Sequence, residues 1–156
     1  MKLADILQPE AVQSLSGIGS KKRLLRTIAE AAEKLHGLDA DQVFNALLER
    51  EALGPTGVGR GIALPHAHVE GLDKVVGGFL RLDTPVNYDA IDHQPVDLVF
   101  YLLAPPETGV EHLKALALVS RTLRDENLVT KLRRNDSPAA LHGMLTDPMV
   151  GRTEAA

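Results

Sequence analysis

An almost unbroken apolar run lies in the second half of the chain: Val96-Asp97-Leu98-Val99-Phe100-Tyr101-Leu102-Leu103. A strand with one solvated face alternates apolar and polar residues, whereas a strand covered on both faces is apolar almost throughout. The run therefore predicts a central β-strand over residues 96–104, covered on both of its faces.

Helix and strand patterns alternate on either side of this central strand. Further strands are predicted over residues 62–64 and 75–82, and a turn-rich connection over 86–95. Helices are predicted by apolar residues at helical spacing and by capping residues, over 20–35, from 39 onward, and over 108–123, 126–134 and 137–145. The alternation of the two patterns indicates an α/β fold.

Length and composition limit the possible classes of protein. The 156 residues fit one domain, which we expect to span residues 1–150, with a flexible tail over 151–156. A net charge of −4 argues against a nucleic-acid binder, and the absence of cysteine removes disulfide scaffolds, thiolate metal sites and cysteine nucleophiles. No apolar run reaches the roughly 20 residues of a membrane span, so we expect a cytoplasmic protein without membrane insertion.

His66 is the first candidate for chemistry. It follows Pro65 and a short strand, directly after a glycine-rich loop, Gly54-Pro55-Thr56-Gly57-Val58-Gly59-Arg60-Gly61. Glycines at alternate positions expose backbone amides and let an anion approach closely. An imidazole titrates near neutrality and could meet a phosphoryl group here. An ordinary loop histidine is the alternative that the local sequence leaves open.

His112 and Arg50 are weaker candidates. His112 lies in the first turns of a predicted helix, where the positive end of the helix dipole favours a nearby anion and a neutral imidazole. A partly buried histidine bonded to a carbonyl explains it equally well. Arg50 ends an apolar helical stripe just before the glycine loop and is suited to bidentate phosphate contact. A solvated arginine at a helix end is the simpler explanation.

Other sites are not supported by the sequence. Three imidazoles, those of His66, His68 and His112, could bind zinc, but neither a carboxylate nor a His-x-x-x-His helix pattern accompanies them, so no metal is expected. The alternate glycines do not have the spacing of a dinucleotide-binding fingerprint, and they leave a helix and enter a strand. A P-loop and a Gly-x-Ser-x-Gly nucleophile elbow are also absent, so no cofactor is expected.

Several motifs together resemble one known family. They are Leu48-Glu49-Arg50-Glu51, Thr56-Gly57-Val58-Gly59-Arg60-Gly61-Ile62-Ala63-Leu64-Pro65-His66, Pro95-Val96-Asp97-Leu98-Val99-Phe100, Ala104-Pro105-Pro106 and Glu111-His112-Leu113-Lys114-Ala115-Leu116-Ala117. Over nearly its whole length the chain resembles the fructose/mannitol-type IIA domains (EIIA type 2) of the bacterial phosphoenolpyruvate-dependent phosphotransferase system. The resemblance implies a single domain with a mixed β-sheet flanked by α-helices on both faces.

The resemblance also implies that the candidates form one site. His66 would accept a phosphoryl group from a small phosphohistidine carrier protein of the HPr/NPr type. His112 would stabilise that group, and Arg50 would help to bind both the group and its donor. The phosphoryl-binding loop would consist of Thr56, Gly57, Gly59 and Gly61.

A free-standing IIA domain is most similar to the nitrogen-regulatory branch of the family. This implies a phosphotransferase component that acts mainly as a regulatory phosphocarrier and controls partner proteins of unknown identity. A sugar-specific IIA subunit that passes phosphate to a IIB partner is the alternative within the family, and a non-catalytic binding module is the alternative outside it. One departure is visible, because His68 occupies the place where the family pattern has a basic residue.

Docking of a carrier protein around His66 requires an exposed apolar patch. The sequence offers Val58, Ile62, Leu64 and the loop after Pro105 as its candidates.

Overall fold

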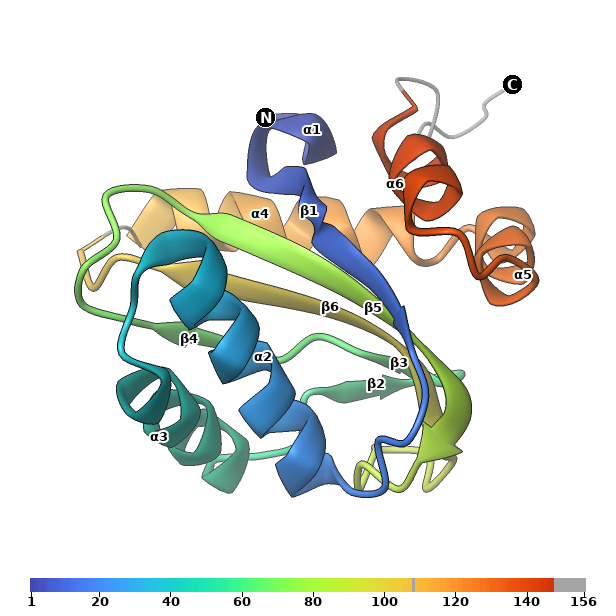
Figure 1. Ribbon diagram of the computed structural model, residues 1–156, viewed down its shortest axis with the longest axis horizontal. Coiled ribbons are helices and arrows are strands. Elements are labelled where there is room, and N and C mark those ends of the chain that lie inside the picture. Colours follow the sequence, from blue (N-terminus) through green and yellow to red (C-terminus); the bar gives the residue numbers. More distant parts are fainter. Residues whose placement is uncertain (108, 148–156) are drawn as a thin grey trace.

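The computed structural model describes residues 1–107 and 109–147, as one layered unit of helices and strands (Figure 1). The elements follow in the order α1 (Leu3–Ile6), β1 (Leu7–Leu15), α2 (Lys21–His36), α3 (Ala40–Ala52), β2 (Gly57–Gly59), β3 (Ile62–Ala63), β4 (His66–His68), β5 (Val76–Val86), β6 (Val96–Ala104), α4 (Gly109–Thr122), α5 (Glu126–Arg133) and α6 (Pro138–Thr146).

The strands of the described residues form one six-stranded mixed sheet in the order β1-β5-β6-β3-β2, with β4 also paired to β6. The pair β5–β6 is antiparallel, as is β2–β3, whereas β1 runs parallel to β5 and both β3 and β4 run parallel to β6. Strand β6 is therefore bordered by β5 along one side and by the two short strands β3 and β4, one after the other, along its other side.

Strand β6 is apolar except at the partly buried Asp97, because both of its faces are covered. Its alternate side chains enter two separate cores: Val99, Tyr101 and Leu103 enter one, and Leu98, Phe100 and Leu102 enter the other. Burial raises the pKa of Tyr101 to about 12. The predicted central strand over 96–104 is confirmed.

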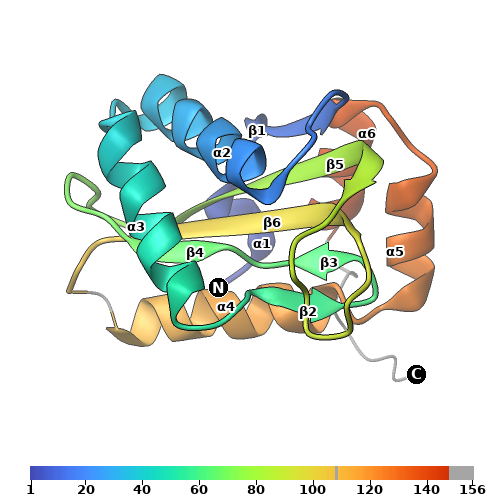
Figure 2. The same cartoon turned by 90° about the horizontal axis from the view of Figure 1, so that it is seen from below.

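Helices cover both faces of the sheet. The first core contains the apolar faces of α2 and α3, and the second contains those of α1, α4, α5 and α6. Figure 2 shows α2 and α4 on opposite sides of the strands. The predicted α/β class and the mixed sheet with helices on both faces are confirmed. No helix within the described residues is both long and apolar enough to cross a membrane.

Helix α2 shows how closely local signals set an element's ends. The Ser20 hydroxyl accepts a hydrogen bond from the Arg23 amide at 3.1 Å, so it caps the first turn. Gly37 ends the helix with φ +70°, a left-handed conformation that glycine adopts without strain. The prediction of a helix over 20–35 is correct to within one residue.

Other elements differ from the sequence-based prediction. The short helix α1 and the strand β1 were not predicted, and β5 continues to Val86 rather than ending at residue 82. Part of the glycine-rich loop is strand β2, and the predicted strand over 62–64 ends at Ala63. Thr108, the predicted cap of α4, lies outside the described residues, as do the predicted end of the domain at residue 150 and the tail over 151–156.

Candidate functional site

Strand β4 presents His66 and His68 on one face of the sheet. Side chains alternate along a strand, and Ala67 between them is buried in the core beneath α2 and α3. The two histidines therefore face the other side, where α4 lies. Strand β4 is held by β6, with His66 opposite Leu102 in the register.

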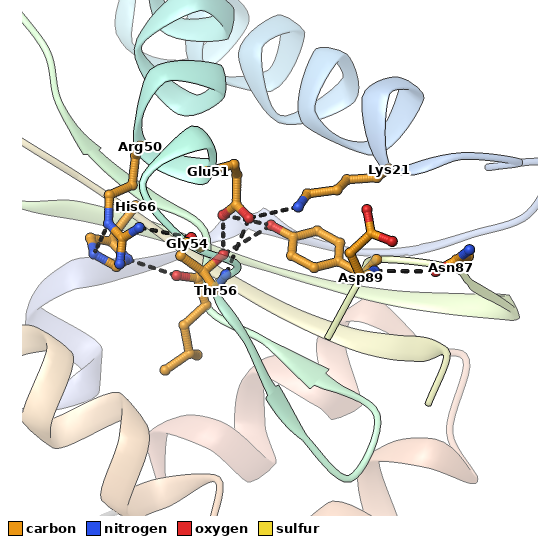
Figure 3. A network of polar contacts seen from close by, with 10 residues as sticks. Lys21, Arg50, Glu51, Gly54, Thr56, His66, Asn87 and Asp89 are labelled. Carbon is orange, nitrogen blue, oxygen red and sulfur yellow. Dashed lines mark hydrogen bonds and ion pairs between the residues drawn. The ribbon is translucent and has the colours of Figure 1, made fainter. Parts of the chain in front are cut away.

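The His66 ring is fixed by hydrogen bonds at both nitrogens (Figure 3). Its Nδ1 lies 2.8 Å from the Leu64 carbonyl oxygen, which can only accept, so Nδ1 carries the ring proton and donates it. Its Nε2 then has the free lone pair and accepts from Arg50 Nε at 3.3 Å. Burial, and to a lesser extent the Arg50 charge, lowers the pKa of His66. The ring is thus neutral at neutral pH, with its nucleophilic nitrogen beside a guanidinium.

Arg50 is held in place from the end of α3. Its guanidinium Nη1 donates to the Gly54 carbonyl at 2.9 Å, while Nε donates to His66. A guanidinium has five N–H donors in a fixed fork, so donors remain for an anion that binds at His66. The arrangement suits the binding of a phosphoryl group.

A buried carboxylate, Glu51, supports the helix end that carries Arg50. It accepts from the Lys21 ammonium at 2.8 Å, from the Thr56 amide at 3.1 Å, from the Tyr88 hydroxyl at 3.1 Å and from the Thr56 hydroxyl (Figure 3). Burial and the charge of Glu51 raise the pKa of Tyr88, so its hydroxyl stays protonated and can donate. The network ties α2, α3 and the start of β2 together next to the site.

His112 lies against both histidines of β4. Its ring centre is 5.4 Å from that of His66 and 4.6 Å from that of His68, both in edge-to-face geometry. Its Nδ1 lies 3.3 Å from His68 Nε2, and His68 Nδ1 lies 3.1 Å from the Pro105 carbonyl oxygen. Burial, together with the neighbouring imidazoles, lowers the pKa of His112 to about 4. The His112 ring is therefore neutral at neutral pH.

The four residues of the predicted phosphoryl-binding loop do not lie together in the structure. Thr56 donates its amide and hydroxyl protons to Glu51, the neighbour of Arg50 in the sequence. Its carbonyl accepts from the Leu64 amide at 2.9 Å. Gly57 pairs with Ala63, and a Cβ there would come within 2.7 Å of the Ala90 side chain. Close packing against the 87–95 loop therefore accounts for Gly57.

Gly59 and Gly61 lie at the tip of the β2–β3 hairpin, both with positive φ. The Gly61 carbonyl accepts from the Leu98 amide, whereas His66 pairs with Leu102, four residues further along β6. At about 3.3 Å per residue this separates the tip from His66 by about 13 Å. The two glycines serve the hairpin turn, and their amides lie outside the cluster of Arg50, His66 and His112.

Some apolar side chains in the β2–β3 hairpin, after α3 and on α4 are exposed. Val58 is exposed, but Ile62 and Leu64 are buried, so two of the predicted docking residues are wrong. The sequence interpretation missed Leu53, which follows α3 and is 84% exposed, and Val110 and Leu113 on α4, which are 65% and 67% exposed. Among residues 1–107 and 109–147, no group of three His, Asp or Glu side chains is arranged to hold a metal ion.

The sequence interpretation also missed Glu51 as part of the site, because a charged residue at the end of an apolar stripe usually indicates a solvent-exposed helix end. The available signal was its place on the same helical face as Val43, Phe44 and Leu47, all of which are buried.

Comparisons with known proteins agree with one another. Residues 5–147 match the family described as "Phosphoenolpyruvate-dependent sugar phosphotransferase system, EIIA 2". A nitrogen regulatory protein of Bradyrhizobium diazoefficiens is 44% identical over 148 residues, which cover 95% of this chain and 97% of that protein. The match therefore spans almost the whole of both chains.

Solved structures give the same result. The crystal structure of nitrogen regulatory protein IIA-Ntr from Neisseria meningitidis superimposes with a TM-score of 0.85 at 34% identity, covering 92% of this chain and 99% of that one. The crystal structure of IIA mannitol from Escherichia coli has a TM-score of 0.73 at 25% identity, covering 88% and 97%.

Proposed function

Because the chain belongs to the EIIA 2 family of the phosphoenolpyruvate-dependent sugar phosphotransferase system, we propose that it is a phosphoryl carrier modified reversibly on Nε2 of His66. The observation that supports this assignment is the pair of hydrogen bonds at the ring: the Leu64 carbonyl fixes the proton on Nδ1, and the free lone pair of Nε2 lies beside Arg50. A neutral imidazole with no proton on Nε2 is the form that can attack phosphorus, once the Arg50 N–H moves from Nε2 to the incoming phosphoryl group.

The donor is a phosphohistidine carrier protein of the HPr/NPr type. The Nε2 lone pair of His66 forms the new P–N bond, and the electron pair of the broken P–N bond returns to the donor imidazole. The Nδ1 proton of His66 stays on its hydrogen bond to the Leu64 carbonyl. One P–N bond replaces another, so the task of the protein is positioning and stabilisation of spread negative charge. Arg50 and His112 would supply that stabilisation.

The modified protein would act as a regulator. A phosphoryl group adds about −1.5 to −2 charges at one surface position, enough to change which partner binds there. Similarity to nitrogen regulatory proteins supports partner control as the role, with partners that distinguish the phosphorylated from the unmodified face.

The test is phosphorylation from radiolabelled phosphoenolpyruvate with the two upstream proteins of the relay. We expect acid-labile label on the chain, with the P–N bond at Nε2 by nitrogen and phosphorus NMR. Label at Nδ1 would contradict the role assigned to the Leu64 carbonyl. A folded chain that takes no label from any carrier would be a binding module.

Substitution of Arg50 by Ala should slow phosphoryl transfer to His66 by about a hundredfold, because a charge-assisted donor is lost from the transition state. Arg50→Lys should recover only part of the rate, since an ammonium cannot donate to His66 and Gly54 in the same fork. Single-turnover kinetics with purified phosphorylated carrier measure the effect. Equal rates for wild type and Arg50→Ala would show that Arg50 has no role in phosphoryl transfer.

Exposed apolar residues next to the site support carrier docking. Replacing Leu113 by Glu should weaken the carrier complex at least tenfold, because it places a charge where an apolar contact forms. The neutral Leu113→Gln variant should weaken it less, and both variants should keep the wild-type melting temperature. Titration calorimetry or NMR shift mapping measures the affinity. Unchanged affinity in both variants would show that the exposed face of α4 at Leu113 is not part of the docking surface.

A sugar-specific role within the family has one supporting observation, the fold shared with IIA mannitol from Escherichia coli. Transfer of label from the phosphorylated chain to a sugar-specific IIB protein would establish that role. Its absence with a panel of IIB proteins, alongside normal labelling by the carrier, supports the regulatory assignment.

A further inference from the structure

We propose that His68 is a positioning residue that fixes the proton of His112 on Nδ1, so that phosphorylation of His66 draws one additional proton onto the His68–His112 pair. The inference rests on the proposed phosphorylation of His66. His68 contacts His112 and the Pro105 carbonyl, and the proposed function gives it no role.

The proton positions follow from one carbonyl. The Pro105 carbonyl oxygen can only accept, so His68 Nδ1 carries a proton and donates it across 3.1 Å. In a neutral His68 the other nitrogen, Nε2, is then an acceptor. It lies 3.3 Å from His112 Nδ1, which must therefore be the donor. A neutral His112 has only one ring proton, so its Nε2 is left bare.

That bare nitrogen is unpaired in the structure. His112 Nε2 is buried and has no hydrogen-bond partner within residues 1–107 and 109–147. The His112 ring stands edge-to-face against His66, with ring centres 5.4 Å apart. A phosphoryl group on His66 brings acceptor oxygens to this ring, and two acceptors without a proton between them repel each other. An N–H at His112 Nε2 turns that repulsion into a charge-assisted hydrogen bond.

The charges around His112 favour this proton only in the phosphorylated state. Facing it from β4 are His66 and His68, which with burial hold its pKa low in the unmodified protein. Arg50 on α3 contacts His66, not His112, and on α4 itself the exposed Glu111 lies 3.8 Å from Lys114. A phosphoryl dianion nearby raises the pKa of His112, and solvent supplies the proton.

Two substitutions at position 68 separate the alternatives. His68→Lys places a donor without any acceptor beside His112 Nδ1, so Nδ1 must accept and the neutral ring carries its proton on Nε2. His68→Gln can still accept through its amide oxygen and leaves the proton on Nδ1. Because His68 is exposed, both variants should fold with the wild-type melting temperature.

The first measurement needs no phosphorylation. Nitrogen-15 NMR of histidine-labelled protein should show His112 as the Nδ1–H form in wild type and His68→Gln, and as the Nε2–H form in His68→Lys. An Nε2–H form in wild type would overturn the positioning role of His68. This result would leave the proposed function of His66 unaffected.

The second measurement uses the phosphorylated carrier. For each variant we measure the equilibrium constant for phosphoryl transfer from the same carrier. The wild-type constant divided by the His68→Lys constant should fall by up to tenfold for each unit that the pH rises between pH 6 and 8. The His68→Gln constant divided by the His68→Lys constant should fall similarly. Nitrogen-15 NMR of phosphorylated wild type should show a proton on Nε2 of His112. A ratio independent of pH, with normal phosphorylation, would overturn proton uptake while the proposed function stands. No phosphorylation of any variant would instead refute the proposed function.

Discussion

A His66→Ala variant accepts no phosphoryl group from the phosphorylated carrier, while its fold and its affinity for that carrier stay close to wild type. The substitution removes the one lone pair that lies beside Arg50 and leaves the surrounding elements in place. The His66 ring is only partly buried, so its loss costs little packing. Radiolabel transfer in a single turnover measures the effect, and the expected loss is complete rather than partial.

His36→Ala is the matched control, because it removes a partly buried histidine at the end of α2, outside the site. It should label like wild type. His112→Ala should label slowly, since a supporting group is lost and the acceptor remains. Label retained on His66→Ala would mean that another side chain is the acceptor, and the assignment would be abandoned.

A Glu51→Ala variant loses about 3 kcal/mol of folding free energy, which lowers the melting temperature by about 10 °C. The carboxylate side chain is 6% exposed and its partner Lys21 20% exposed. Removing it leaves the Lys21 ammonium and the Thr56 amide without their shared acceptor, and the desolvation cost of those groups is no longer offset. Thermal unfolding followed by circular dichroism measures the loss.

Glu49→Ala provides the control, because this exposed glutamate lies on the same helix two residues away. Its cost should be within about 0.5 kcal/mol of zero. Glu51→Gln keeps the hydrogen-bond geometry without the charge and should fall between the two. Equal melting temperatures for the Glu49 and Glu51 variants would show that the buried network contributes nothing to stability.

Elements with a strong local pattern could be predicted from the sequence. Strand β6 has an apolar run without alternation, and α2 has an apolar stripe between a serine cap and a terminal glycine. In both, local preference and tertiary environment demand the same structure. The prediction of an α/β fold depended largely on these two elements.

Strand β1 could not be predicted because its own sequence argues against a strand. Pro9 lacks an amide proton, and the pairing with β5 shifts register between Leu7 and Val12, the segment that contains the proline. Proline is tolerated in sheets on edge strands and at bulges, and β1 is the first strand of the sheet order. Its partner β5, far away in the sequence, decides its conformation.

The site was only partly visible in the sequence. His66, Arg50 and His112 were selected one by one, and the structure brings the three side chains together. Gly59 and Gly61 were selected with them because glycines at alternate positions resemble an anion-binding loop, whereas the hairpin turn explains both. His68 lies on the same strand face as His66, which a two-residue period would have indicated had β4 been recognised as a strand.

The parallel pairing of β1 with β5 has a consequence for how the chain assembles. Leu7 aligns with Gly77 and Leu15 with Leu82, so β1 is synthesised about 70 residues before the strand with which it pairs. Until β5 emerges, α2 and α3 can form only locally, and closing so long a loop is entropically unfavourable. Docking of the amino-terminal strand should therefore be a late and slow event during synthesis, with the outer edge of β5 open until it is complete.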